Sequence, residues 1–154
     1  MELEIKTLPS MRVAAMPHSG PYNEIGPAFR KLAGIAGPAG LFVQPGAMML
    51  GIYKDDPATT PVAALRSAAA IVIGAETPIP LGLVEDHVVA GTFASVTLIG
   101  AYSGLPNAWM TLKKTLIPEG GHTLRVAASY EIYRNDPTEV PESALCTEIY
   151  VPIA

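Results

Sequence analysis

The stretches "GIYKDDPATTP" (51–61) and "EIYRNDPTEVP" (131–141) are near copies of each other, 80 residues apart in the chain. When the sequence is aligned with itself at this offset, residues 11–73 match residues 91–153 without a gap, and sixteen of the aligned positions are identical. A fixed period of this kind indicates that one structural unit was used twice. The sequence therefore predicts a fold built from two copies of one structural unit.

Each repeat shows the same order of sequence patterns. Short runs that alternate apolar and polar residues predict strands, and apolar residues spaced by three or four predict an amphipathic helix. In the first repeat the strands are expected at 3–8, 11–18, 47–54 and 66–73, with a helix within 20–37. In the second repeat two strands are expected within 81–99, a helix within 103–117, and one strand each within 122–135 and 145–153. The linker 74–82 joins repeat 1, about 1–74, to repeat 2, about 82–154.

The predicted fold class is α+β, a duplicated β-β-α-β-β module with antiparallel sheets. Residues 1–154 form a single domain in this prediction. Two such modules could continue one sheet, or they could face each other around a pseudo-twofold axis with a helix from each half beside a central cleft. Clefts with apolar walls and a few polar groups are common ligand sites.

Composition excludes several classes of function. Apolar residues make up 49% of the 154-residue chain and charged residues 16%, which argues against disorder. The net charge of −4 and the scattered lysines and arginines argue against direct binding to nucleic acid. The longest apolar stretch, 67–75, is far below the ~20 residues that span a bilayer.

The cysteine and histidines point to no cofactor or metal. Cys146 is the only cysteine, so no internal disulfide can form and a reduced, cytoplasmic location is expected by default. His18, His87 and His122 lie far apart and lack metal-ligand spacing. The glycine-rich segment 37–46 has neither P-loop nor dinucleotide spacing.

Four segments together resemble the GyrI-like family, the effector-binding domain of AraC/Rob-type and MerR-type regulators. They are "HSGPYNEIGPAF" (18–29), "GIYKDDPATTP" (51–61), "YEIYRNDPTEVP" (130–141) and "TEIYVPI" (147–153). The resemblance covers essentially the whole chain and implies a duplicated, SHS2-type fold that binds cationic or aromatic compounds in a central cleft. Since no helix-turn-helix precedes Met1, a stand-alone member is expected.

Glu131 is the first candidate for a site residue. It lies on an apolar strand, where a carboxylate costs free energy unless it is paired or lies in a wet cleft. The matching residue of the first repeat is Gly51, so one copy supplies a charge and the other supplies space. The resemblance implies that this glutamate meets the ligand; an exposed edge position, or an ion pair with Arg125 or Arg134, is the alternative.

Aromatic residues are the remaining candidates for ligand binding. Tyr53 and Tyr133 are equivalent positions that could stack on a planar or cationic ligand or simply pack. Trp109, equivalent to Phe29, fits either the core or a cleft wall. Tyr22 and Tyr102 mark the helix entrances, where a structural role is the alternative. Glu148 is a second candidate carboxylate, whereas Asp55 and Asp56 are expected to stabilise a turn.

Three functions remain open at this point. The first is binding of a cationic or aromatic small molecule, with Glu131 as the counter-charge. The second, implied by the resemblance, is hydrolysis of cyclopropane-bearing or other electrophilic genotoxins, with Glu131 and Tyr53 as catalytic residues. The third is inhibition of DNA gyrase by protein contact.

Overall fold

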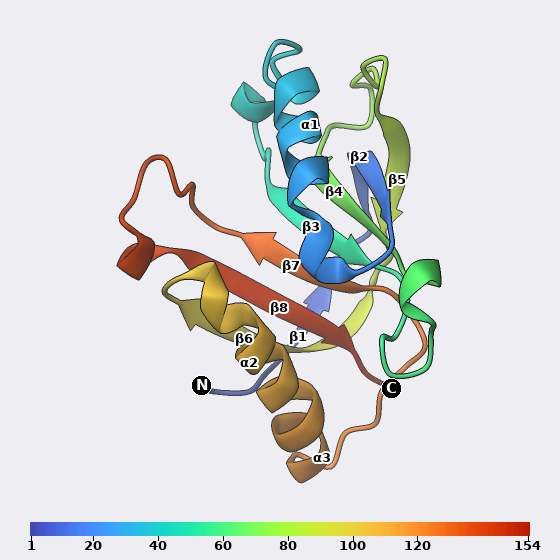
Figure 1. The fold of residues 1–154 in the computed structure, drawn as a ribbon, viewed down its shortest axis with the longest axis vertical. Helices are drawn as coiled ribbons and strands as arrows, with labels where there is room; N and C mark the ends of the chain where they lie inside the picture. Colours follow the sequence, from blue (N-terminus) through green and yellow to red (C-terminus); the bar gives the residue numbers. More distant parts are fainter. The chain divides into compact units, whose positions relative to one another are not determined.

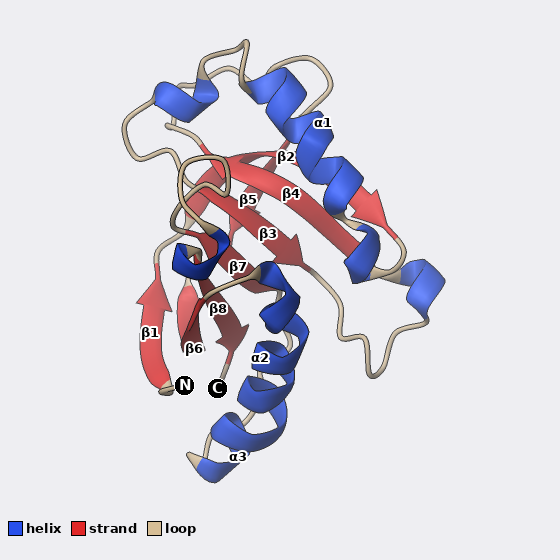
Figure 2. Cartoon of the chain, turned by 60° about the vertical axis from the view of Figure 1, so that its left-hand side comes forward, coloured by secondary structure: helices blue, strands red, loops and turns tan.

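The computed structural model describes residues 1–154 and divides them into two compact units. The first unit is Pro9–Ala90, and the second unit combines Met1–Leu8 with Gly91–Ala154. Each unit contains a four-stranded antiparallel sheet and one main helix, drawn in Figures 1 and 2. The α+β class predicted from the sequence is therefore confirmed.

The first unit has its strands in the order β3-β4-β2-β5. The α1 helix lies over β2 and β4 and buries one face against them. Pro27 is tolerated because it falls in the first turn of this helix, where its missing N–H costs nothing. The elements are β2 Met11–Ser19, η1 Tyr22–Glu24, α1 Gly26–Ala36, η2 Leu41–Val43, β3 Met49–Tyr53, η3 Val62–Ala64, β4 Arg66–Val72 and β5 Val84–Val88.

The second unit has its strands in the order β1-β6-β8-β7. Its helix is longer and contains a π-helical turn, η5, of the kind often found near functional sites. Figure 1 shows this helix along β8 and β6. The elements are β1 Glu4–Leu8, β6 Gly91–Ile99, η4 Tyr102–Gly104, α2 Leu105–Thr111, η5 Leu112–Leu116, α3 Ile117–Glu119, β7 Ser129–Tyr133, η6 Glu142–Ala144 and β8 Cys146–Pro152.

The strand registers of the two units differ by the same 80 residues as the sequence repeat. Gly51 pairs with Ala69 in the first unit, and Glu131 pairs with Ile149 in the second. The repeat in the sequence therefore has a counterpart in the hydrogen-bonded pairing of the strands.

The first strand of each repeat pairs with the sheet of the other repeat. β1 opens the chain but pairs with β6, and β5 opens the second repeat but pairs with β2. The repeats predicted at about 1–74 and 82–154 thus differ from the compact units by this exchange. The two strands predicted within 81–99 are β5 and β6, separated at residues 89–90.

Helix and sheet share one apolar core in the second unit. Ala108, Leu112 and Ile117 of the helical segment pack against Ala94, Val96, Ile149 and Val151 of the sheet. Because side chains alternate along a strand, every β8 residue in step with Ile149 lies on this helix-covered face. The same face carries Glu131, since Glu131 is the direct partner of Ile149.

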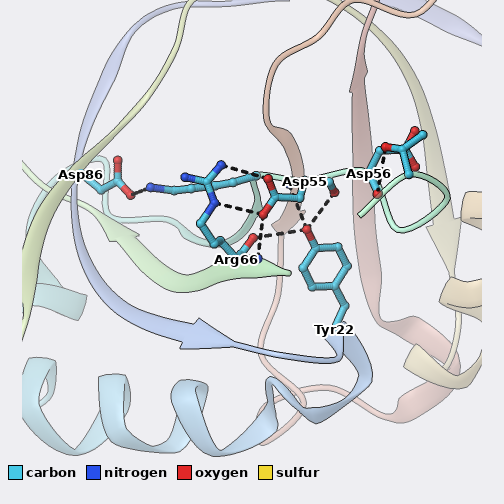
Figure 3. A network of polar contacts seen from close by, with 7 residues as sticks. Tyr22, Asp55, Asp56, Arg66 and Asp86 are labelled. Atoms are coloured by element: carbon cyan, nitrogen blue, oxygen red, sulfur yellow. Dashed lines mark hydrogen bonds and ion pairs between the residues drawn. The ribbon is translucent and has the colours of Figure 1, made fainter. Parts of the chain in front are cut away.

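Tyr22 holds the helix entrance of the first unit to the loop that follows β3 (Figure 3). Its hydroxyl accepts a hydrogen bond from the backbone N–H of Asp55 (3.0 Å) and donates to the Asp55 carbonyl oxygen (2.8 Å). The Asp55 carboxylate in turn accepts three hydrogen bonds from Arg66, at 2.8, 3.0 and 2.9 Å. These bonds to Arg66 lower the pKa of the Asp55 carboxyl group.

The second unit keeps only the backbone-to-side-chain bond of this network, from the N–H of Cys146 to Asn135. Asn135 and Cys146 replace the ion pair, and the Asn135 side chain bonds to the Ala144 carbonyl oxygen and the Cys146 N–H. The Tyr102 hydroxyl makes no hydrogen bond in the structure. Tyr22 and Tyr102 are thus equivalent in sequence but not in bonding.

Replacing Tyr22 by Phe should destabilise the protein, because the Asp55 N–H loses its partner. We expect a loss of about 1–2 kcal/mol of unfolding free energy in urea denaturation. Tyr102→Phe is the matched control and should change stability by less than about 0.5 kcal/mol. Equal losses in the two variants would contradict the structural difference between the two tyrosines.

Candidate functional site

Glu131 is a buried carboxylate in the middle of β7. Only 5% of the residue is exposed, and it lies on the face of the sheet that the helix covers. Ile149 and Val151 lie on the same face, and a buried carboxylate next to apolar side chains needs hydrogen-bond donors.

Two aromatic side chains supply those donors. The indole Nε1–H of Trp109, from α2, donates to Oε2 of Glu131 at 2.5 Å. The Tyr133 hydroxyl, two residues along the same strand, donates to Oε1 at 2.7 Å. Each carboxylate oxygen therefore has a protein donor, and hydrogen bonds to an ionised acceptor are among the strongest in proteins. The result is an oriented negative charge between two aromatic rings.

Tyr102 extends this aromatic cluster to the protein surface. Its ring meets the Tyr133 ring edge-on, with centroids 5.8 Å apart, and 36% of the residue is exposed. Burial, together with the negative charges of Asp136 and Glu131, raises the pKa of the Tyr102 hydroxyl. We call Glu131, Trp109, Tyr133 and Tyr102 the Glu131 cluster.

The first unit has no such charge, and its equivalent position is filled. A Cβ atom added to Gly51 would lie 2.8 Å from the Tyr53 hydroxyl oxygen, so the Tyr53 side chain covers this glycine. Tyr53 also meets Tyr22 edge-on at 5.0 Å. Phe29 stands in place of Trp109 and has no N–H to donate. The space expected at Gly51 is therefore occupied by Tyr53.

Glu148 lies on the opposite face of β8 from the Glu131 cluster. It accepts hydrogen bonds from Arg134 (2.8 Å) and from the Tyr150 hydroxyl (2.6 Å). Burial opposes ionisation of Glu148, but these bonds and the Arg134 charge outweigh it, and the pKa of Glu148 is lowered. Burial and the contact with Glu148 raise the pKa of Tyr150 to about 12. This carboxylate is held in an ion pair with Arg134, whose side chain is 43% exposed.

Three buried hydroxyl groups, those of Ser67, Ser95 and Thr147, have no hydrogen-bond partner, and no sequence pattern singled them out. Ser67 and Thr147 occupy equivalent positions of the two repeats, on strands opposite Tyr53 and Tyr133. Each side-chain oxygen is buried without a hydrogen-bond partner. The signal that could have found Ser67 and Thr147 is the recurrence of a hydroxyl residue, 80 positions apart, on an otherwise apolar strand.

Other kinds of site receive no support from the geometry. No group of three or more His, Cys, Asp or Glu side chains comes together to hold a metal ion. His18 contacts the carbonyl oxygen of Pro21 at 3.0 Å. None of the helices is both long enough and apolar enough to cross a membrane.

The whole chain, residues 1–154, matches the GyrI-like small molecule binding domain. The protein belongs to the GyrI-like family. A probable transcriptional regulator, YgiV of Escherichia coli K12, is 26% identical over 157 residues, covering 100% of this chain and 97% of the relative. A DNA gyrase inhibitor of Yersinia enterocolitica is 30% identical over 126 residues, covering 76% of each protein.

Solved structures share the fold at low sequence identity. SAV2435 bound to tetraphenylphosphonium is similar with a TM-score of 0.74 at 14% identity, covering 100% of this chain and 94% of the other. The C-terminal domain of EcmrR gives 0.73 at 17%, covering 99% and 97%. A hydrolase encoded by lin2189 of Listeria innocua gives 0.66 at 10%, covering 99% and 92%.

The Glu148 ion pair predicts a specific response to acid. Because folding lowers the pKa of this carboxyl below its ordinary 4.5, the pair stabilises the protein above that pH. This contribution is lost as the pH falls through the lowered pKa. Thermal unfolding from pH 7 to 3 should therefore show a steeper loss of stability in the wild type than in Glu148→Gln. Parallel profiles would contradict a stabilising pair.

Proposed function

We propose that the protein binds organic cations with aromatic or apolar groups, and that the Glu131 cluster recognises their positive charge. The observation that carries this proposal is the buried Glu131 carboxylate held between Trp109 and Tyr133. A negative charge surrounded by rings complements a delocalised or apolar cation, because the rings attract it through their faces while the carboxylate neutralises it.

The relatives support this proposal without deciding it. The family is one of small-molecule binding domains, and SAV2435, a protein of the same fold, was solved with an aromatic cation bound. We assign Glu131 the role of counter-charge and Trp109, Tyr133 and Tyr102 the role of ring surfaces. For Tyr53 and Tyr22, contact with the ligand stays a prediction. The Tyr22 hydroxyl already bonds to the backbone of Asp55.

Removing the charge of Glu131 should weaken cations selectively. In calorimetric titrations, Glu131→Gln should bind tetraphenylphosphonium about tenfold or more weakly than the wild type. Its affinity for the neutral triphenylphosphine oxide should change far less. Glu148→Gln is the matched control, since it removes a carboxylate from the other face of the sheet and should leave both affinities unchanged. Equal losses for the cation and the neutral compound in Glu131→Gln would refute the charge role.

A hydrolase is the second candidate, favoured by the contact between the Tyr133 hydroxyl and Glu131. Glu131 could act as a general base toward water while a tyrosine hydroxyl polarises an electrophile. The geometry favours Tyr133 for that role, because it touches Glu131 directly, over the Tyr53 expected from the sequence.

Turnover separates this candidate from binding alone. If the protein is a hydrolase, mass spectrometry should detect a product 18 Da heavier than a cyclopropane-bearing alkylating compound, and Glu131→Gln should abolish its formation. Unchanged substrate after prolonged incubation with the wild type would rule against hydrolysis of that compound.

The gyrase alternative rests on the 30%-identical gyrase inhibitor. No surface feature of this chain specifies a partner of that kind, so we place it third. A supercoiling assay with purified gyrase addresses it directly.

A further inference from the structure

Thr147 is a buried residue whose hydroxyl has no hydrogen-bond partner. It lies on β8 with 0% of its surface exposed, directly opposite Tyr133. Strand alternation places its side chain on the same face of the sheet as Ile149, and therefore on the same face as Glu131. A hydroxyl without a partner thus lies on the face of the sheet that carries Glu131, two residues along the paired strands from it.

Such a group needs a reason to be there. Burying a hydroxyl without a partner costs free energy, and native proteins contain few such groups. Valine has the same shape and suits a strand equally well, so packing and strand preference do not require the hydroxyl. A hydrogen-bond partner supplied by a bound ligand would explain the Thr147 hydroxyl.

The Glu131 carboxylate and the Thr147 hydroxyl together indicate which chemical groups the ligand carries. An ionised carboxylate only accepts hydrogen bonds, whereas a threonine hydroxyl both accepts and donates. Opposite residues on paired strands have Cβ atoms roughly 5 Å apart and diagonal ones roughly 7–8 Å, so one small group can reach the Glu131 carboxylate and the Thr147 hydroxyl together. Two acceptors at this spacing complement a cation with more than one N–H.

We propose that Thr147 is a specificity-determining residue of the Glu131 site. Its hydroxyl accepts a hydrogen bond from the ligand and selects protonated amines, amidinium or guanidinium groups over quaternary cations. The proposal rests on the function proposed above. It requires the Tyr133 ring to move aside, because this ring stands directly across from Thr147 and reaches to Glu131.

The first unit provides a matched control. Ser67 is 3% exposed, lies opposite Tyr53 and also has an unpartnered hydroxyl. Its neighbour at the position equivalent to Glu131 is Gly51, so no carboxylate stands beside it. Loss of the Ser67 hydroxyl should therefore leave recognition of the cation unchanged.

The test compares 1-naphthylmethylammonium with its N,N,N-trimethyl derivative by calorimetry. The two share the ring and the charge, but only the first has N–H donors. We expect the wild type to prefer the primary ammonium by about tenfold. Thr147→Val should reduce this preference to about twofold or less, whereas Thr147→Ser and Ser67→Ala should retain it. Thr147→Val should unfold at the same or a higher temperature than the wild type, since an unpaired hydroxyl is removed.

The other possible outcomes distinguish the role of Thr147 from the proposed cation binding. An unchanged preference in Thr147→Val, an equal loss for both compounds, or no preference in the wild type would overturn the role of Thr147. If Glu131→Gln then still weakened both compounds, the proposed cation binding would stand. If neither compound bound the wild type, cation binding at Glu131 and the role of Thr147 would both fall. If Thr147→Val failed to fold, the wild-type preference and Thr147→Ser would still decide, because loss of the preference in Thr147→Ser would also overturn the proposal.

Discussion

A carboxylate on the helix-covered face of a sheet is the constraint around which the second unit is built. The Glu131 carboxylate shares this face with Ile149 and Val151, and Trp109 and Tyr133 provide one hydrogen-bond donor for each of its oxygens. The Trp109 bond links α2 to β7, and the Tyr133 bond links two side chains of the same strand. The carboxylate that links the helix to the sheet is therefore also the proposed counter-charge for a ligand.

The two units differ in side chains at positions that the 80-residue offset makes equivalent. The strand registers are the same after a shift of 80 residues, yet the side chains that differ are those with chemical consequences. In the first unit Tyr53 covers Gly51, and Tyr22 is fastened to the backbone beside the Asp55–Arg66 pair. In the second unit Glu131 replaces the glycine, Trp109 replaces Phe29, and the Tyr102 hydroxyl is left without a bond. In the first unit Tyr53 fills the position that is equivalent to Glu131, whereas the second unit holds the candidate site.

Local patterns predicted the class of fold and pointed to Glu131 as the central residue of the candidate site. Alternation and helical spacing located the strands and helices, and the oddity of a glutamate on an apolar strand identified Glu131. The exchange of β1 and β5 could not be predicted, because an alternating edge strand fits several sheet edges equally well. Nor could the difference between Tyr22 and Tyr102, since it depends on backbone groups near residues 55 and 135. The covering of Gly51 by Tyr53 depends on a side-chain rotamer, which no sequence pattern specifies.

The account depends on ligands meeting Glu131 where Trp109 contacts it. Trp109 is the only tryptophan of the chain, so intrinsic fluorescence reports on this position alone. The most direct measurement is a fluorescence titration of the wild type and Glu131→Gln with tetraphenylphosphonium. The account predicts a saturable change in tryptophan emission in the wild type and a much weaker affinity in the variant. Calorimetric binding that leaves the emission unchanged, or an equal response in both proteins, would contradict it.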